Sequence, residues 1–183
     1  LEFRRVLFRS EGFGVQIITD NGTVWNLKEG NRPDSLTADS VYRVVSRFAP
    51  VADSEAIAYS FWKVISPLPK PESEYESIHL DPVDIQSIWQ SGDYLNMVLQ
   101  VMVKDKEHEL SFIDNGITSN ANGTQTLHLT LYHHRKDDVE GFMQKYYLSV
   151  PLWHYQGKLN KGDTIVFELY TYKEGMTQRT FTY

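Results

Sequence analysis

Histidine and aspartate residues gather in the segment 128–138, and their side chains are of the kinds that bind transition metals. Imidazole nitrogens and carboxylate oxygens together could hold Zn²⁺ or a related ion. The candidate ligands are His128, His133, His134, Asp137 and Asp138. Because neighbouring residues of a strand point to opposite faces, His133 and His134 cannot both face one ion while the strand continues. We therefore expect a solvated passage from strand to loop, with no metal and no cofactor.

Three aspartates in the segment 81–93 could act as the paired carboxylates of a glycosidase, which lie roughly 5–9 Å apart across a cleft. The candidates are Asp81, Asp84 and Asp93. Asp81 precedes Pro82 and is typical of a loop that enters a strand, while Asp93 is typical of a turn. The chain also lacks a G-x-S-x-G nucleophile elbow, a G-x-G-x-x-G run and a Walker A motif. We therefore predict no catalytic residues and no enzymatic activity.

Aromatic rings could stack on sugars if several were exposed on one sheet face. The four tryptophans are Trp25, Trp62, Trp89 and Trp153. Large aromatic residues of strands more often belong to a core. Two Asn-Gly-Thr triplets, which begin at Asn21 and Asn122, match the glycosylation pattern, but Asn-Gly is also typical of tight turns. A carbohydrate-binding module that uses exposed Trp or Tyr remains the alternative to a protein-binding or structural module.

Composition favours an all-β protein and excludes several classes of site. Of the 183 residues, 13% are aromatic and none is cysteine, and the formal net charge is −6. Without cysteine there is no disulfide framework, thiolate zinc site, iron–sulfur ligation or cysteine nucleophile. An acidic chain is poorly suited to neutralise phosphates, so we expect no nucleic-acid partner. No apolar run of about 18 residues is present to span a membrane as a helix.

The elements before residue 67 predict a small barrel. Two strand-like runs flank Asp20-Asn21-Gly22 in the segment 15–27, which predicts a hairpin with its turn at Asn-Gly. Further strands are expected over 41–48 and 56–65. About four strands in this space suit an OB-like barrel over 11–66.

The first ten residues, LEFRRVLFRS, match a codon-by-codon translation of the end of a common sequencing-library adapter. We therefore interpret 1–10 as an artefact to be excluded from fold reasoning. The alternative is a basic β-strand, because Phe3, Val6, Leu7 and Phe8 are good strand formers. On the adapter interpretation the OB-like domain lacks its first strand, and any signal sequence or lipid-acceptor cysteine is missing with the natural N-terminus.

Prolines at alternate positions, Pro67, Pro69 and Pro71, predict an extended linker over 67–76. Beyond it, six or so strands separated by turn signals predict an antiparallel β-sandwich over 77–183. The expected strands are 94–103, 108–113, 125–132, 146–152, 163–172 and 178–183.

Two further features of this half concern its local structure. The strand 125–132 alternates, with its three leucines facing inward and His128 and Thr130 facing outward. The segment 138–146 is the one place where a short helix is expected, and Gly141 weakens it.

The second half resembles the C-terminal β-sandwich of NigD-like proteins. The matching residues are Asp81-Pro82-Val83-Asp84-Ile85, Ile88-Trp89 and Gly92-Asp93-Tyr94-Leu95-Asn96. Further agreement lies in His108 with the strand after it, the strand 127–133, Tyr147-Leu148-Ser149-Val150-Pro151-Leu152 and Thr180-Phe181-Thr182-Tyr183. The resemblance implies an N-terminal OB-like domain and brings no catalytic residues to carry over.

The resemblance also implies a place and a role. NigD-like proteins are exported, lipid-anchored envelope proteins of Gram-negative bacteria, named after a gene cluster associated with bacteriocin production. The family's signal peptide and acceptor cysteine are missing from this chain. We therefore expect a non-enzymatic lipoprotein of the periplasm or outer membrane, which binds an unknown protein partner or serves as a structural module. Its contact with a membrane is expected only through the lipid anchor.

Overall fold

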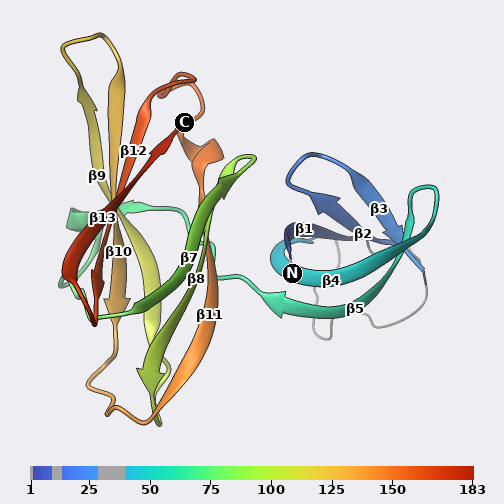
Figure 1. Ribbon diagram of the computed structural model, residues 1–183, viewed down its shortest axis with the longest axis horizontal. Coiled ribbons are helices and arrows are strands. Elements are labelled where there is room, and N and C mark those ends of the chain that lie inside the picture. Colours follow the sequence, from blue (N-terminus) through green and yellow to red (C-terminus); the bar gives the residue numbers. More distant parts are fainter. Residues whose placement is uncertain (1, 10–13, 29–39) are drawn as a thin grey trace. The chain divides into compact units, whose positions relative to one another are not determined.

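The computed structural model describes residues 2–9, 14–28 and 40–183, and its regular elements are strands apart from two short 3₁₀ helices. The chain divides into two compact units, residues 1–64 and 65–183 (Figure 1). The predicted all-β class is confirmed. Within the described ranges no helix has the length and apolar character needed to cross a membrane.

The first unit is a five-stranded sheet. Its strands are β1 (Glu2–Arg9), β2 (Gly14–Thr19), β3 (Val24–Leu27), β4 (Ser40–Ala52) and β5 (Glu55–Lys63). They pair in the order β1-β2-β3-β5-β4, and β1 pairs with β4 as well as with β2. The segment predicted to derive from an adapter therefore supplies a strand, and its origin stays a prediction, as does the OB-like assignment.

The predicted hairpin of the first unit forms between β2 and β3. Gly22 has a φ of +86°, a value that glycine adopts without steric cost, and the turn closes with a hydrogen bond from its N–H to the carbonyl of Thr19. Ile17, Val44 and Ala58 are buried together as the core of this unit. The Asn-Gly pair was sufficient to predict this hairpin because the turn involves only a few consecutive residues.

The second unit is a β-sandwich of two sheets. Its elements are β6 (Lys70–Pro71), η1 (Glu72–Glu74), β7 (Asp84–Ser91), β8 (Tyr94–Val103), β9 (Glu109–Ser119), β10 (Gln125–His134), β11 (Phe142–Pro151), η2 (Leu152–Tyr155), β12 (Thr164–Thr171) and β13 (Gly175–Thr182). One sheet has the order β13-β12-β10-β9-β6 and the other the order β11-β8-β7 (Figure 1). Most pairs are antiparallel, as predicted, but β12 pairs in parallel with β10 because β11 crosses between them to the other sheet.

The proline-rich segment 67–76, predicted as a linker, contributes two elements to the second unit. Strand β6 pairs in parallel with β9, so that Lys70 is opposite Ile113. In the following helix η1, the N–H of Tyr75 donates to the carbonyl of Glu72. Tyr75 then reaches β9, where its hydroxyl donates to the carbonyl of Phe112 at 2.9 Å.

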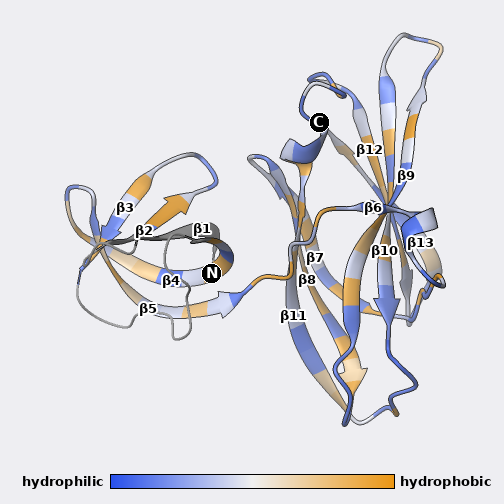
Figure 2. Cartoon of the chain, turned by 180° about the vertical axis from the view of Figure 1, so that it is seen from behind, coloured by the Kyte–Doolittle hydropathy of each residue, from blue (hydrophilic) through white to orange (hydrophobic). Residues whose placement is uncertain are grey.

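The core of the sandwich is formed by the inward side chains of both sheets. Figure 2 shows apolar and polar residues following one another along these strands. The predicted alternation of β10 is confirmed, since its three leucines are buried whereas His128 and Thr130 lie on the other face. The prediction of a short helix over 138–146 is wrong. Strand β11 begins at Phe142, which is opposite Val103 of β8, and this ladder replaces helical hydrogen bonds.

Tyr155 of η2 places a polar group in this core. Its side chain is fully buried, and its hydroxyl donates to Asp114 Oδ2 at 2.9 Å. Burial and then the charge of Asp114 raise the pKa of Tyr155 well above its ordinary value of 10.0. We expect Tyr155→Phe to lower the free energy of unfolding by about 1.5–3 kcal/mol, because a hydrogen bond to a charged group is lost. Urea unfolding measures this, and an unchanged midpoint would show that the bond contributes nothing.

Candidate functional site

A shallow cavity of about 500 Å³ lies on the sheet β13-β12-β10-β9-β6 of the second unit, on the face that points away from the core. We call it the outer-face hollow. Its lining residues come from the segment 72–80 and from four strands: Glu72, Ile78, Leu80, Ile113, Asn115, Thr118, His128, Thr130, Glu168 and Met176. Large apolar side chains are exposed at its edge, with 36% of Ile78 and 49% of Met176 accessible. Tyr170, opposite Met176 in the sheet, extends this apolar surface.

Polar groups on the floor of the outer-face hollow are already joined to one another. Asn115 Nδ2 donates to Thr130 Oγ1 at 2.7 Å, and Thr130 Oγ1 donates to Glu168 Oε2 at 3.3 Å. Thr118 Oγ1 lies 2.9 Å from His128 Nε2. The floor is therefore held in a fixed arrangement, and the apolar edge is the part that a partner could bury.

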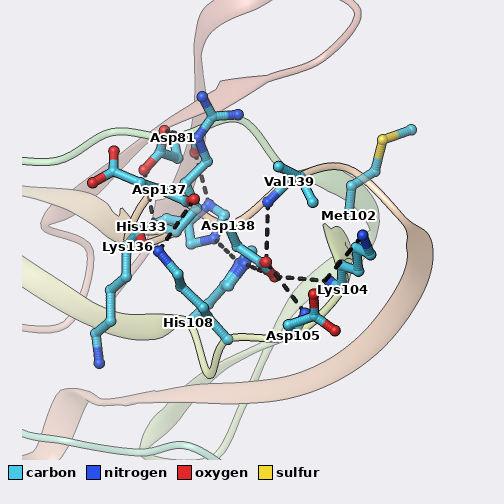
Figure 3. Close-up of polar contacts among 12 residues, drawn as sticks. Asp81, Met102, Lys104, Asp105, His108, His133, Lys136, Asp137, Asp138 and Val139 are labelled. Carbon is cyan, nitrogen blue, oxygen red and sulfur yellow. Dashed lines mark hydrogen bonds and ion pairs between the residues drawn. The ribbon is translucent and has the colours of Figure 1, made fainter.

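A second polar feature, the histidine cluster, consists of His108, His133 and Asp138 (Figure 3). His108 Nδ1 lies 2.9 Å from His133 Nε2, and His108 Nε2 lies 3.3 Å from Asp138 Oδ2. The far nitrogen of His133, Nδ1, lies 2.9 Å from the carbonyl oxygen of Asp81. All three side chains are buried. The cluster thus joins the loop before β9, the end of β10 and the loop after it.

The carboxylate of Asp138 is held by backbone donors of two loops. It accepts hydrogen bonds from the N–H of Lys104 at 2.7 Å and of Asp105 at 3.2 Å, and from its own neighbour Val139 at 3.0 Å. The N–H of Lys104 above all, and then that of Asp105, lower the pKa of Asp138 well below its ordinary value of 3.8. Asp138 is therefore a charged acceptor and not a proton donor.

Burial favours the neutral form of the His133 imidazole, whereas the hydrogen bonds of Asp138 favour its charged form. Only 1% of this residue is accessible, and burial lowers its pKa below the ordinary 6.5, with a further lowering from the neighbouring His108. His133 is therefore neutral in the folded protein over most of the pH range.

These two lowered pKa values predict acid sensitivity. Below pH 6.5 the unfolded chain binds a proton at His133 that the folded chain resists, so the free energy of unfolding falls as the pH drops from 6.5. The depressed pKa of Asp138 extends this loss below pH 3.8. Urea unfolding at pH 7.5, 6 and 5 should show the decrease, and His133→Gln should reduce it. Equal slopes in both proteins would contradict the assignment.

The remaining candidate metal ligands do not converge. His134 lies on the face opposite to His133, and its ring stacks on His79 with 3.6 Å between centroids. Asp137 has a φ of +54° in the loop after β10. In the part of the chain that the structure describes, no group of three or more His, Cys, Asp or Glu residues is arranged to hold a metal.

The three aspartates considered for glycoside hydrolysis are spread along β7. Asp84 begins this strand and Asp93 follows its end, so roughly 25 Å of extended chain separates them. This is far beyond the spacing of a glycosidase pair. Asp81 instead accepts the backbone N–H of Arg135 at 2.9 Å, and Asp84 lies 3.9 Å from Lys173 Nζ. Their surroundings are those of ion-paired surface carboxylates.

The tryptophans occupy four different elements. Trp25 lies on β3, Trp62 on β5, Trp89 on β7 and Trp153 in η2. They do not form a row on one sheet face of the sandwich, which the carbohydrate-binding alternative requires. Both Asn-Gly-Thr triplets lie in turns, since Gly123, like Gly22, has a positive φ.

His108 belongs to the histidine cluster but was not among the candidate metal ligands identified in the sequence. It lies 25 positions before His133, and contact between them depends on the pairing of β9 with β10, in which Leu110 is opposite His133. The single signal available was its position just before a strand that could pair with the strand 125–132.

Comparison with known proteins supports the fold over the whole chain. A family model described as the NigD-like C-terminal beta sandwich domain matches residues 66–183. A NigD-like immunity protein from Bacteroides caccae is 29% identical, with a TM-score of 0.80, over 100% of this chain and 95% of that one. No curated protein matches the chain.

Two further solved structures share the fold at lower identity. A protein of unknown function from Bacteroides vulgatus is 19% identical, with a TM-score of 0.74, over 100% of this chain and 89% of that one. A candidate lipoprotein from Bacteroides fragilis is 12% identical, with a TM-score of 0.63, over 98% of this chain and 95% of that one. Because the family model matches more than half of the chain, the chain belongs to the NigD-like family.

Proposed function

We propose that this NigD-like chain is a lipid-anchored, non-enzymatic protein of the bacterial cell envelope that binds a protein partner through the outer-face hollow. The observation that carries the proposal is the exposure of Ile78 and Met176 among the residues that line a hollow with a hydrogen-bonded polar floor. Interfaces are enriched in methionine and aromatic residues at their centre and have polar rims. The hollow offers an exposed methionine, Met176, with Tyr170 opposite it in the sheet, although here the polar groups lie on the floor and the apolar ones at the edge.

A protein partner agrees with the description of the Bacteroides caccae relative as an immunity protein. Known bacteriocin–immunity pairs, such as colicin nucleases with their immunity proteins, are tight protein–protein complexes. The envelope location is supported by the candidate lipoprotein of Bacteroides fragilis, whose fold is shared. A link to bacteriocin-associated genes belongs to the same proposal.

A carbohydrate ligand is the less favoured alternative. The apolar lining of the outer-face hollow is aliphatic, from Ile78, Leu80, Ile113 and Met176, and the ring of Tyr170 lies beside it, whereas a sugar-binding platform needs a row of planar rings. Enzymatic activity is disfavoured by the surroundings of the carboxylates, because Asp138 is buried against backbone donors and Asp81 is paired with Arg135.

Site-specific photocross-linking in a Bacteroides host tests the proposal. Benzoylphenylalanine replaces Met176 in one variant and, as a matched control, Phe142 in another. Phe142 is 59% exposed and lies on β11 of the other sheet. We expect one protein adduct from position 176 that is absent from position 142. Equal adducts from both positions, or none from 176, would overturn the proposed binding surface.

A further inference from the structure

The hydrogen bonds of the histidine cluster fix how many protons its two rings can hold. The Nδ1 of His133 faces a carbonyl oxygen, which only accepts, so this nitrogen carries a proton. The Nε2 of His108 faces the carboxylate of Asp138 and carries a proton for the same reason. The two remaining nitrogens face each other at 2.9 Å, and a hydrogen bond between them needs one proton shared by both.

The two rings therefore hold three N–H protons on four nitrogens and carry one positive charge beside the charge of Asp138. With two protons, a pair of lone pairs would face each other inside the protein. With four protons, two N–H groups would face each other, and each ring would carry a positive charge. Both states lose the central hydrogen bond and leave buried polar groups without a partner.

We propose that the histidine cluster is a proton-dependent clasp, which holds the loop 135–141 against the loop 104–108 while the two rings carry three protons. Asp138 belongs to the first loop and accepts from Lys104 and Asp105 of the second. Lys106 Nζ adds a hydrogen bond to the carbonyl of Lys136 at 2.6 Å. Gain of a further proton at His133 breaks the hydrogen bond between the two rings and weakens the clasp, so the two loops separate in acid.

The loop that the clasp holds is conformationally strained. Lys136 and Asp137 both have a φ of +54°, in the left-handed region that L residues adopt at a cost. Loss of the clasp therefore favours relaxation of this loop.

Other charged groups around the rings are already engaged. Arg135 pairs with Asp81, with 3.5 Å between Arg135 Nε and Asp81 Oδ1, and Lys104 lies 3.9 Å from Asp105. Lys106 donates to loop carbonyls. Asp138 is thus the carboxylate that faces the pair, and His133 is the group that gains a proton in acid.

Nuclear magnetic resonance of the full chain tests the clasp. At pH 7 the ring nitrogens of His108 and His133 should show three N–H protons between them. The amide protection factor of Lys104, whose N–H donates to Asp138 of the other loop, should fall at least tenfold at pH 5. His133→Gln, which can still donate and accept, should remove most of the acid response, whereas the control His128→Gln should keep it.

Two results would overturn the inference. One is a pair with only two N–H protons at pH 7, which the wild-type spectrum reveals even if the Gln variant fails to fold. The other is a protection factor at Lys104 that is constant between pH 7 and 5, or an acid response that His128→Gln abolishes as fully as His133→Gln does.

Discussion

Replacing Phe167 by alanine is expected to destabilise the second unit by about 3–5 kcal/mol. Phe167 is fully buried on β12, and its ring lies edge-on to that of Phe112 on β9, with 6.3 Å between centroids. Alanine leaves a cavity between the sheets that these side chains cannot fill without moving the strands. Urea unfolding followed by hydrogen exchange of β10 and β12 amides measures the loss in this unit.

Phe142→Ala is the matched control for this prediction. The same substitution at a 59% exposed side chain should change the free energy of unfolding by no more than about 0.5 kcal/mol. Similar losses from both variants would contradict the placement of the core between the two sheets.

His108→Leu is expected to have the second largest effect, a loss of about 2–4 kcal/mol. The leucine fills similar space but leaves His133 Nε2 and the carboxylate of Asp138 without their hydrogen bonds to His108. Removing one partner of a buried hydrogen bond is more damaging than replacing both, because the remaining polar group stays buried without its partner. Urea unfolding at pH 7 measures the change.

The control is His128→Leu, on the neighbouring strand β10 and outside the histidine cluster. Its ring bonds to Thr118 on the outer sheet face, so about 1 kcal/mol or less should be lost. If His108→Leu is neutral or stabilising, the cluster does not hold the two loops together.

Local signals in the sequence predicted several elements correctly. Asn21-Gly22 predicted the β2–β3 hairpin because a positive φ is required within four residues of chain. The alternation of leucines in β10 predicted its buried face because side chains of a strand point alternately to its two sides. The opposite orientations of His133 and His134 follow from the same rule.

What the sequence did not predict depends on long-range pairing. The segment 138–146 was expected to be helical, but Phe142 and the residues after it pair with β8, some 40 positions earlier. The contact of His108 with His133 needs the register of β9 on β10. The outer-face hollow likewise depends on the return of the segment 72–80 to the sheet, which single-chain periodicity cannot reveal.

Binding of a protein in the outer-face hollow is tested by placing a charge on its apolar lining. The most direct measurement is the affinity for the cross-linked partner, by calorimetry, of the wild type, Ile78→Asp, Met176→Asp and the control Phe142→Asp. We predict that each aspartate in the hollow weakens binding at least tenfold, a change of about 1.4 kcal/mol, while the control changes it less than twofold. Equal affinities for all four proteins would contradict the claim.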